Sequence, residues 1–259
     1  MKKFIYIIAE GVLDVVFATE VLRRCFGGTV VGEKSALPQE ASRWLEQFKW
    51  PVGDDIARKA VPAPAFILCG ERFIAMRNAQ GISRIGKMLN ADTESFLRLR
   101  WNPDALCILL DADEEEPGTR FGEFAALIEN TGYPRPESLD VPMESNGTRS
   151  AVFSFPGDGK RGTLEDVLRP LACARFPGLA EHAERYVETW IRTEDAGSHD
   201  FKELCRPAAK SKALLSSMTA LLKPGKPIIA SLEDQNWIPE EFELCGALVP
   251  FLRFLKELL

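Results

Sequence analysis

Two short, unbroken apolar runs constrain the fold of this chain more than any other feature. Residues 4–9 are rich in β-branched and aromatic side chains, and residues 106–110 contain no polar residue. Such runs are typical of strands that are buried on both faces of a parallel sheet, with helices on either side. After the first run, apolar residues recur at helical spacing over residues 12–22. The opening of the chain therefore predicts a strand, a turn and a helix.

The remaining patterns extend this alternation. Further strands are predicted at residues 29–31, 65–69 and 150–155, and helices at residues 82–89 and 121–128. Beyond Pro170 the clear signals are helical, at residues 179–191, 208–222 and 242–258. Alternating strands and helices predict an α/β fold with a mostly parallel, Rossmann-like sheet flanked by helices. We expect this domain to span residues 1–170, and residues 171–259 to form a helical C-terminal extension packed on it.

Composition and charge limit the class of protein. Hydrophobic residues make up 46% of the 259 residues and charged residues 27%, which is ordinary globular usage. The formal net charge of −6 gives no overall basic field to attract nucleic acid. That objection is partial, because carboxylates that bind a metal ion lose their effective charge. The six cysteines lie far apart and are expected to be structural thiols.

The N-terminus resembles a signal peptide only superficially. Its apolar run is short and is interrupted by Glu10, and no segment approaches the roughly 20 apolar residues of a membrane span. We therefore expect a cytoplasmic protein that makes no membrane contact.

Acidic side chains follow both of the apolar runs. Glu10 comes directly after the first, Asp14 stands four residues later, and Asp111 and Asp113 follow the second. In an open parallel sheet, functional groups lie at the carboxyl ends of the strands, so these acids would share one edge if the two strands are neighbours. Clustered carboxylates repel unless a cation neutralises them, and oxygen ligands suit Mg²⁺ or Mn²⁺. The alternative is that each acid caps a helix or is solvated.

These acidic motifs resemble a known signature. The sequence E-G-V-L-D at residues 10–14 and L-D-A-D at residues 110–113 are similar to the Toprim motifs of topoisomerases, bacterial primases, small RNA-maturation nucleases and OLD-type nucleases. The resemblance covers roughly residues 3–170, and residues 118–121 and 162–166 resemble a family of small stand-alone Toprim-like proteins. It implies a Toprim-like fold and metal ligands at Glu10, Asp14, Asp111 and Asp113.

A second group of candidates lies later in the chain. Glu165 and Asp166 open a predicted helix, where they would complete a second metal site or cap the helix, with Thr163 and Asp166 at the capping-box spacing. Lys210 and Lys212 lie in a predicted helix, and a lysine in this region resembles one that some Toprim relatives direct at the phosphate being cleaved. We take Lys212 as the catalytic candidate; a solvated helix face is the alternative for both lysines.

Three exposed candidates complete the predicted site. Glu115 extends the acidic run and would reach the metal or be solvated. Lys160 and Arg161 lie in a glycine-rich segment that lacks the order of a phosphate-binding P-loop. A flexible loop is the preferred interpretation, and contact of Lys160 and Arg161 with a nucleic-acid backbone is the functional alternative.

Three functions remain open from the sequence. The first is a Mg²⁺- or Mn²⁺-dependent nuclease acting on DNA or RNA, with Glu10 as general base or metal ligand and with Asp111 and Asp113 as catalytic metal ligands. The resemblance suggests a role in phage defence beside an ABC-type ATPase partner, and a homo-oligomer is the alternative assembly. The second is a non-catalytic Toprim-like binding or regulatory subunit. The third is a phosphatase with Asp111 as nucleophile, which is disfavoured because Glu115 stands where that chemistry usually has threonine or valine.

Overall fold

The structure, a computed structural model, describes residues 2–48, 63–191, 203–242 and 245–259. The chain forms two compact units. The sheet unit comprises Met1–Leu110, Gly118–Ser154 and Leu252–Leu259, and the helical unit comprises Asp111–Pro117 and Phe155–Phe251. The boundaries of these two units differ from those of the predicted domains 1–170 and 171–259. The division into those two domains stays a prediction.

The sheet unit contains a mixed seven-stranded sheet with the order β2-β3-β4-β1-β5-β7-β6. At its centre, β1 (Lys3–Ala9) is parallel to both β4 (Arg72–Asn78) and β5 (Ala105–Asp111). The other pairs with a determined register are antiparallel and involve β2 (Thr29–Val30), β3 (Ala65–Cys69), β6 (Met143–Ser145) and β7 (Thr148–Phe155). The predicted α/β fold with a largely parallel, Rossmann-like core is confirmed.

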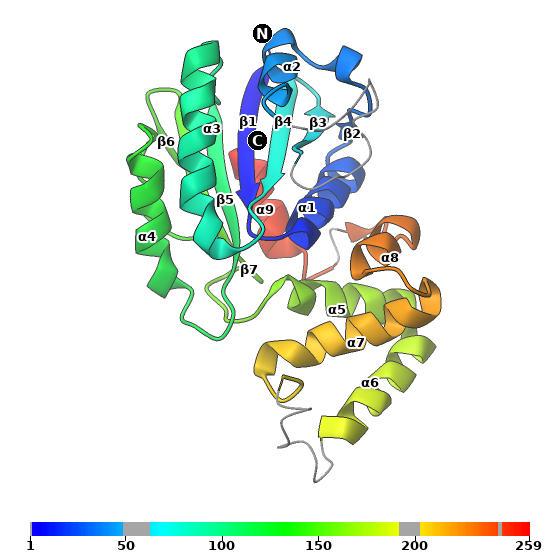
Figure 1. Ribbon diagram of the computed structural model, residues 1–259. Helices are drawn as coiled ribbons and strands as arrows, with labels where there is room; N and C mark the ends of the chain where they lie inside the picture. Colours follow the sequence, from blue (N-terminus) through cyan, green and yellow to red (C-terminus); the bar gives the residue numbers. More distant parts are fainter. Residues whose placement is uncertain (1, 49–62, 192–202, 243–244) are drawn as a thin grey trace. The chain divides into compact units, whose positions relative to one another are not determined.

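Helices cover both faces of this sheet (Figure 1). The side chains of Phe4, Tyr6 and Ile8 alternate along β1 and therefore share one face. They lie in one core with apolar residues of α2 (Gln39–Leu45), α3 (Ile85–Leu99) and α4 (Gly118–Glu129). On the other face, the Phe254 ring of α9 (Val249–Leu258) lies 4.8 Å from the Phe153 ring of β7. Helix α1 (Val12–Cys25) contacts β3 and β4, and two short 3₁₀ turns span Lys34–Ala36 and Ile82–Arg84.

The helical unit is built around three helices that pack on one another. These are α5 (Leu164–Arg175), α6 (Pro177–Ile191) and α7 (Pro207–Leu222), and α8 (Ile228–Asp234) packs on α7. Ion pairs join them, between Arg169 of α5 and Glu184 of α6, and between Lys210 of α7 and Glu188 of α6 at 2.9 Å. The apolar contacts come from buried side chains of α5, α6 and α7, among them Leu168, Leu171, Val187, Leu214, Leu215 and Met218.

The prediction of a helix over residues 242–258 was wrong in its first part. Helix α9 begins at Val249, residues 245–248 are not helical, and residues 243–244 lie outside the described part of the chain. Pro250 explains the late start, because proline has no backbone N–H and is tolerated only in the first turn of a helix.

A strand that the sequence did not predict lies at the centre of the sheet. β4 pairs with β1 on one side and β3 on the other, yet it carries Arg77. This arginine is buried, and its Nη1 atom lies 2.5 and 2.6 Å from the two carboxylate oxygens of Asp92 on α3. The Tyr6 hydroxyl donates to the same carboxylate. Burial and the Asp92 charge raise the pKa of Tyr6 well above its ordinary value, so the phenol stays protonated and serves as the donor.

The cysteines agree largely with their predicted structural role. Cys69 and Cys107 are buried, whereas Cys205 is exposed, and all six are thiols. Burial raises the pKa of Cys25 to about 12 and that of Cys107 well above its usual value, which disfavours reactive thiolates there. Within the described residues, the helices are too short or too polar for any of them to span a bilayer.

Candidate functional site

The two strands that precede the predicted acidic residues are neighbours. β1 and β5 pair in parallel with Ala9 opposite Leu109, and the Glu10 N–H donates to the Leu109 carbonyl at 3.1 Å. Strand β5 ends at Asp111. Glu10 and the end of β5 therefore lie at the same edge of the sheet, the edge where parallel sheets carry their functional groups. The two strands are therefore neighbours, and the sharing of one cation by the Glu10, Asp111 and Asp113 side chains stays a prediction.

Asp111 and Asp113 are attached to the N-terminus of α5. The Leu164 N–H, at the first residue of α5, donates to Asp111 Oδ1 at 2.8 Å. Asp113 has a φ of 55° and forms a two-way backbone bridge with Gly162, with N···O distances of 2.8 and 2.9 Å. The left-handed conformation is tolerated by aspartate better than by most residues, and such conformations are concentrated at functional sites.

The Asp166 carboxylate binds groups at the start of α5 and on α7. Thr163 and Asp166 form the predicted capping box, in which the Thr163 N–H donates to Asp166 Oδ2 at 2.9 Å. The Ser211 hydroxyl of α7 donates to the other oxygen, Oδ1, at 2.7 Å. Because each carboxylate oxygen of Asp166 accepts a hydrogen bond, one from the start of α5 and one from α7, Asp166 links these two helices.

Helix α7 also brings the predicted lysine to the predicted glutamate. Lys212 Nζ lies 4.0 Å from Glu165 Oε2, with the Glu165 side chain 12% exposed and the lysine 47% exposed. Lys210 instead lies 2.9 Å from Glu188 and 4.0 Å from Glu184, both on α6. The structure thus brings Lys212 to Glu165 and places Lys210 in a contact between α6 and α7.

The candidates of the sheet unit stand at the start of α1. The Gly11 N–H donates to Asp14 Oδ2 at 2.6 Å, so the Asp14 carboxylate caps the start of α1. Asp14 is also buried. Glu10 is partly exposed, and its Oε2 atom is buried. Their role as metal ligands stays a prediction.

The three remaining candidates, Glu115, Lys160 and Arg161, are on the surface. Glu115 and Lys160 are exposed, and Arg161 forms an ion pair with Glu116. That ion pair joins the acidic run after β5 to the glycine-rich loop before α5. Contacts of Lys160 and Arg161 with a nucleic-acid backbone stay predictions.

The donor chemistry around the start of α5 fits a hard divalent cation. The Asp111 carboxylate accepts from the first N–H of α5, the Asp113 backbone pairs with Gly162 two residues before this helix, and Glu165 lies in its first turn. Within the described part of the chain, no three histidine, cysteine, aspartate or glutamate side chains form a ready-made metal group. Mg²⁺ does not require one, since it usually keeps several waters and binds one or two carboxylates together with substrate phosphates.

Gly162 and Ser211 are residues of this site that the sequence interpretation did not identify as such. Gly162 was noted only as part of a glycine-rich segment, although its φ of 135° and its bridge to Asp113 make it essential to the local geometry. Ser211 lies between the two lysines that were considered. The capping-box spacing was the available signal for Asp166, and no local pattern identified its partner on α7.

Gly162→Ala is expected to destabilise the protein by about 1–3 kcal/mol, because alanine does not readily adopt this backbone conformation. An added Cβ would also lie 2.6 Å from Asp166 Oδ2 and 3.3 Å from Pro156 Cδ. Gly159→Ala is the matched control, since Gly159 also has a positive φ, of 65°, but an added Cβ there meets nothing within 4 Å. Urea denaturation of the two variants measures the difference. Equal stabilities would contradict the assigned crowding.

Comparisons with known proteins bear on the family and the fold. A family model described as "Protein of unknown function (DUF3226)" matches residues 6–258. The crystal structure of hypothetical protein PH0156 from Pyrococcus horikoshii OT3 is similar, with a TM-score of 0.57 and 17% sequence identity over 99% of this chain and 95% of that chain. No curated protein matches the sequence. At this identity the structural likeness supports the α/β fold and carries no information about activity.

Proposed function

This chain belongs to the family described as protein of unknown function (DUF3226), a description that assigns no activity, and we therefore propose a function from its site: a Mg²⁺- or Mn²⁺-dependent nuclease. The observation that carries the proposal is made at the start of α5, where the Leu164 N–H binds the Asp111 carboxylate and Lys212 approaches Glu165. The Toprim resemblance of residues 10–14 and 110–113 gave the same chemistry from sequence.

The start of α5 offers complementary charges for a phosphodiester. A helix N-terminus carries partial positive charge and attracts phosphate oxygens. Lys212, half exposed beside Glu165, adds a full positive charge that can contact the same phosphate. Asp111 and Asp113 supply carboxylate oxygens for a cation, and Glu165 is the next ligand candidate. A bound divalent ion lowers the pKa of a water ligand and neutralises charge that develops on the phosphate.

Hydrogen bonds orient the residues that would act. Asp111 is fixed by the Leu164 N–H, and the backbone of Asp113 is fixed by Gly162. The Ser211 hydroxyl fixes Asp166, which in turn accepts from the Thr163 N–H at the start of α5. Such supporting hydrogen bonds around metal ligands are typically worth 10- to 100-fold in metal affinity or activity.

The test is a comparison of two variants that each remove one negative charge from the acidic segment. Wild-type protein is incubated with labelled single-stranded DNA, double-stranded DNA and RNA, with Mn²⁺, with Mg²⁺ or with EDTA. We expect metal-dependent shortening of at least one substrate, loss of that activity in Asp113→Asn, and retention in Glu114→Gln, whose side chain is exposed. Equal cleavage by Asp113→Asn and wild type would remove the assigned site.

A non-catalytic binding or regulatory subunit is the second candidate. The hydrogen bonds that engage Asp14 and Asp166 at helix starts support it, since those carboxylates already have a structural task. It predicts binding of Mn²⁺ or nucleic acid, measured by calorimetry, without cleavage of any substrate. An ATPase partner and a role in phage defence stay predictions under either function.

A further inference from the structure

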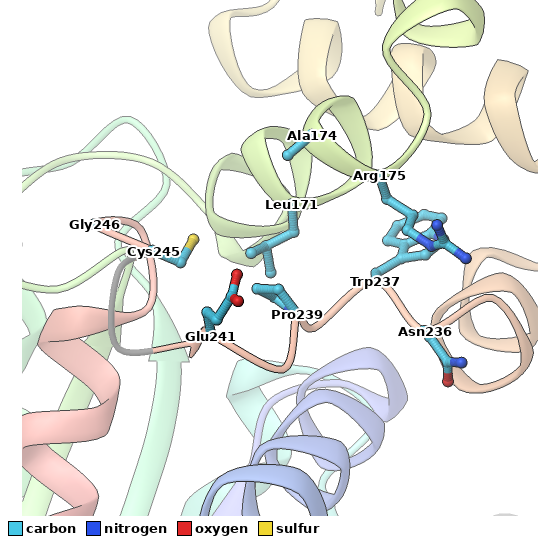
Figure 2. Close-up of a pocket in the computed structure, with 9 residues that line it drawn as sticks. All are labelled: Leu171, Ala174, Arg175, Asn236, Trp237, Pro239, Glu241, Cys245 and Gly246. Carbon is cyan, nitrogen blue, oxygen red and sulfur yellow. The ribbon is translucent and has the colours of Figure 1, made fainter.

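The helical unit contains a pocket that the proposed nuclease site does not use (Figure 2). Its volume is about 490 Å³, within the range of small-molecule sites. One wall comes from the second half of α5, and the other comes from the segment that follows α8. Glu165, the metal-ligand candidate on α5, lies at the opposite end of this helix, in its first turn.

The pocket has an apolar floor. Leu171 and Trp237, which are 2% and 1% exposed, form the buried part of its lining, and Ala174 and Pro239 add apolar surface nearer to solvent. An apolar ligand body suits these side chains, because contact with them removes its surface from water.

Arg175 supplies a positive charge at the pocket. Every other described arginine of the helical unit forms an ion pair with a glutamate, namely Arg161, Arg169, Arg185 and Arg206. Arg175 forms none with any described residue. Its Nε donates to the Gln235 carbonyl at 3.5 Å, and its guanidinium carbon lies 5.3 Å from the centre of the Phe176 ring. These contacts leave the terminal guanidinium nitrogens able to donate to an anion.

The two charged groups of the lining are separated. Figure 2 shows Arg175 beside the Trp237 end of the pocket and Glu241 at the end with Cys245. An anionic group is therefore favoured at one end and disfavoured at the other. A molecule with one carboxylate and an apolar body can place its charge at Arg175 and its apolar end near Glu241. A molecule with carboxylates at both ends would place one of them near Glu241, which repels it.

We propose that this pocket binds a small monocarboxylate with an aliphatic or aromatic body. The carboxylate contacts the Arg175 guanidinium, a pairing that is commonly bidentate, and the body lies on Leu171 and Trp237. The proposal is independent of the nuclease function, because it involves neither the metal nor the acidic residues near the first turn of α5.

Calorimetric titration with three compounds of equal chain length tests the proposal in the absence of metal. Octanoate is the monocarboxylate probe, octanamide is its neutral analogue, and octanedioate carries a second carboxylate. We expect saturable binding of octanoate and at least about tenfold weaker binding of the other two, as for loss of a charge-assisted hydrogen bond or placement of a second anion near Glu241. Equal binding of octanoate and octanamide, or no saturable binding of octanoate up to about 10 mM, would overturn the proposal.

Variants locate the site without disturbing the core. Arg175→Gln is expected to weaken octanoate binding about tenfold or more, and Arg185→Gln on α6 is its control. Ala174→Trp should fill the pocket and remove binding, whereas Ala220→Trp, at another exposed helical alanine, should not. Octanoate binding that survives both Arg175→Gln and Ala174→Trp would place the compound elsewhere on the protein.

Discussion

Asp92→Ala is expected to lower the free energy of unfolding by about 3–5 kcal/mol, the usual cost of removing one partner of a buried ion pair. Asp92 accepts hydrogen bonds from Arg77 through both carboxylate oxygens and from the Tyr6 hydroxyl. The side chains of Arg77 and Asp92 are only 10% and 5% exposed. The variant would leave a buried guanidinium and a buried phenol without their shared acceptor, next to the central strands β1 and β4.

Thermal unfolding followed by circular dichroism measures this effect. For a chain of this size we expect the Tm to fall by roughly 6–20 °C. Replacing both partners with apolar residues, as in Arg77→Met with Asp92→Leu, should recover part of the loss, because neither buried charge then remains. A Tm within the error of wild type for Asp92→Ala would show that the ion pair does not contribute to stability.

Asp111→Asn is expected to reduce metal-dependent cleavage at least about 100-fold, since losing a direct ligand should exceed the 10- to 100-fold effect of losing a supporting hydrogen bond. Asparagine keeps a side-chain oxygen that can accept from the Leu164 N–H, so the start of α5 should be preserved. The negative charge that would bind the cation is lost. The loss of activity should therefore occur with little change in stability.

The readouts are the initial rate of cleavage with Mn²⁺ and the urea midpoint of unfolding. Asp111→Ala removes the hydrogen-bond acceptor as well as the charge, and it should cost about 1 kcal/mol of stability in addition to the activity. Glu114→Gln, which removes an exposed charge three residues away, should leave both readouts unchanged. Undiminished cleavage by Asp111→Asn would show that the carboxylate is not a metal ligand.

The sequence predicted the part of the site that depends on strand order. The two apolar runs predicted buried strands, and the strand order that would bring the following acids to one edge was left as a condition, which the pairing of β1 with β5 meets. These predictions succeeded because strands buried on both faces leave an uninterrupted apolar pattern. β4 lies in the same core but was missed, because the buried Arg77 breaks its pattern and the partner that compensates for it is on another element.

Contacts between helices were beyond the reach of sequence patterns. The capping-box spacing predicted the start of α5, and residues 208–222 were predicted as a helix, but neither signal contains information on which residue of α7 faces which residue of α5. The bond from Ser211 to Asp166 and the approach of Lys212 to Glu165 depend on that register. The prediction placed the start of α9 too early for a local reason, since the helix was extended from its first turn, which contains Pro250, back through Gly246 to residue 242.

The sheet unit is assembled from three separate stretches of chain, and this has a consequence for folding. Its core includes Phe254, so the face of the sheet around Phe153 stays uncovered until residues 252–259 have been synthesised. An N-terminal fragment that stops at residue 170 would retain the strands but expose apolar surface on one side. During synthesis this apolar surface therefore stays exposed on the ribosome until the whole helical unit has emerged. A chaperone could bind it during that period.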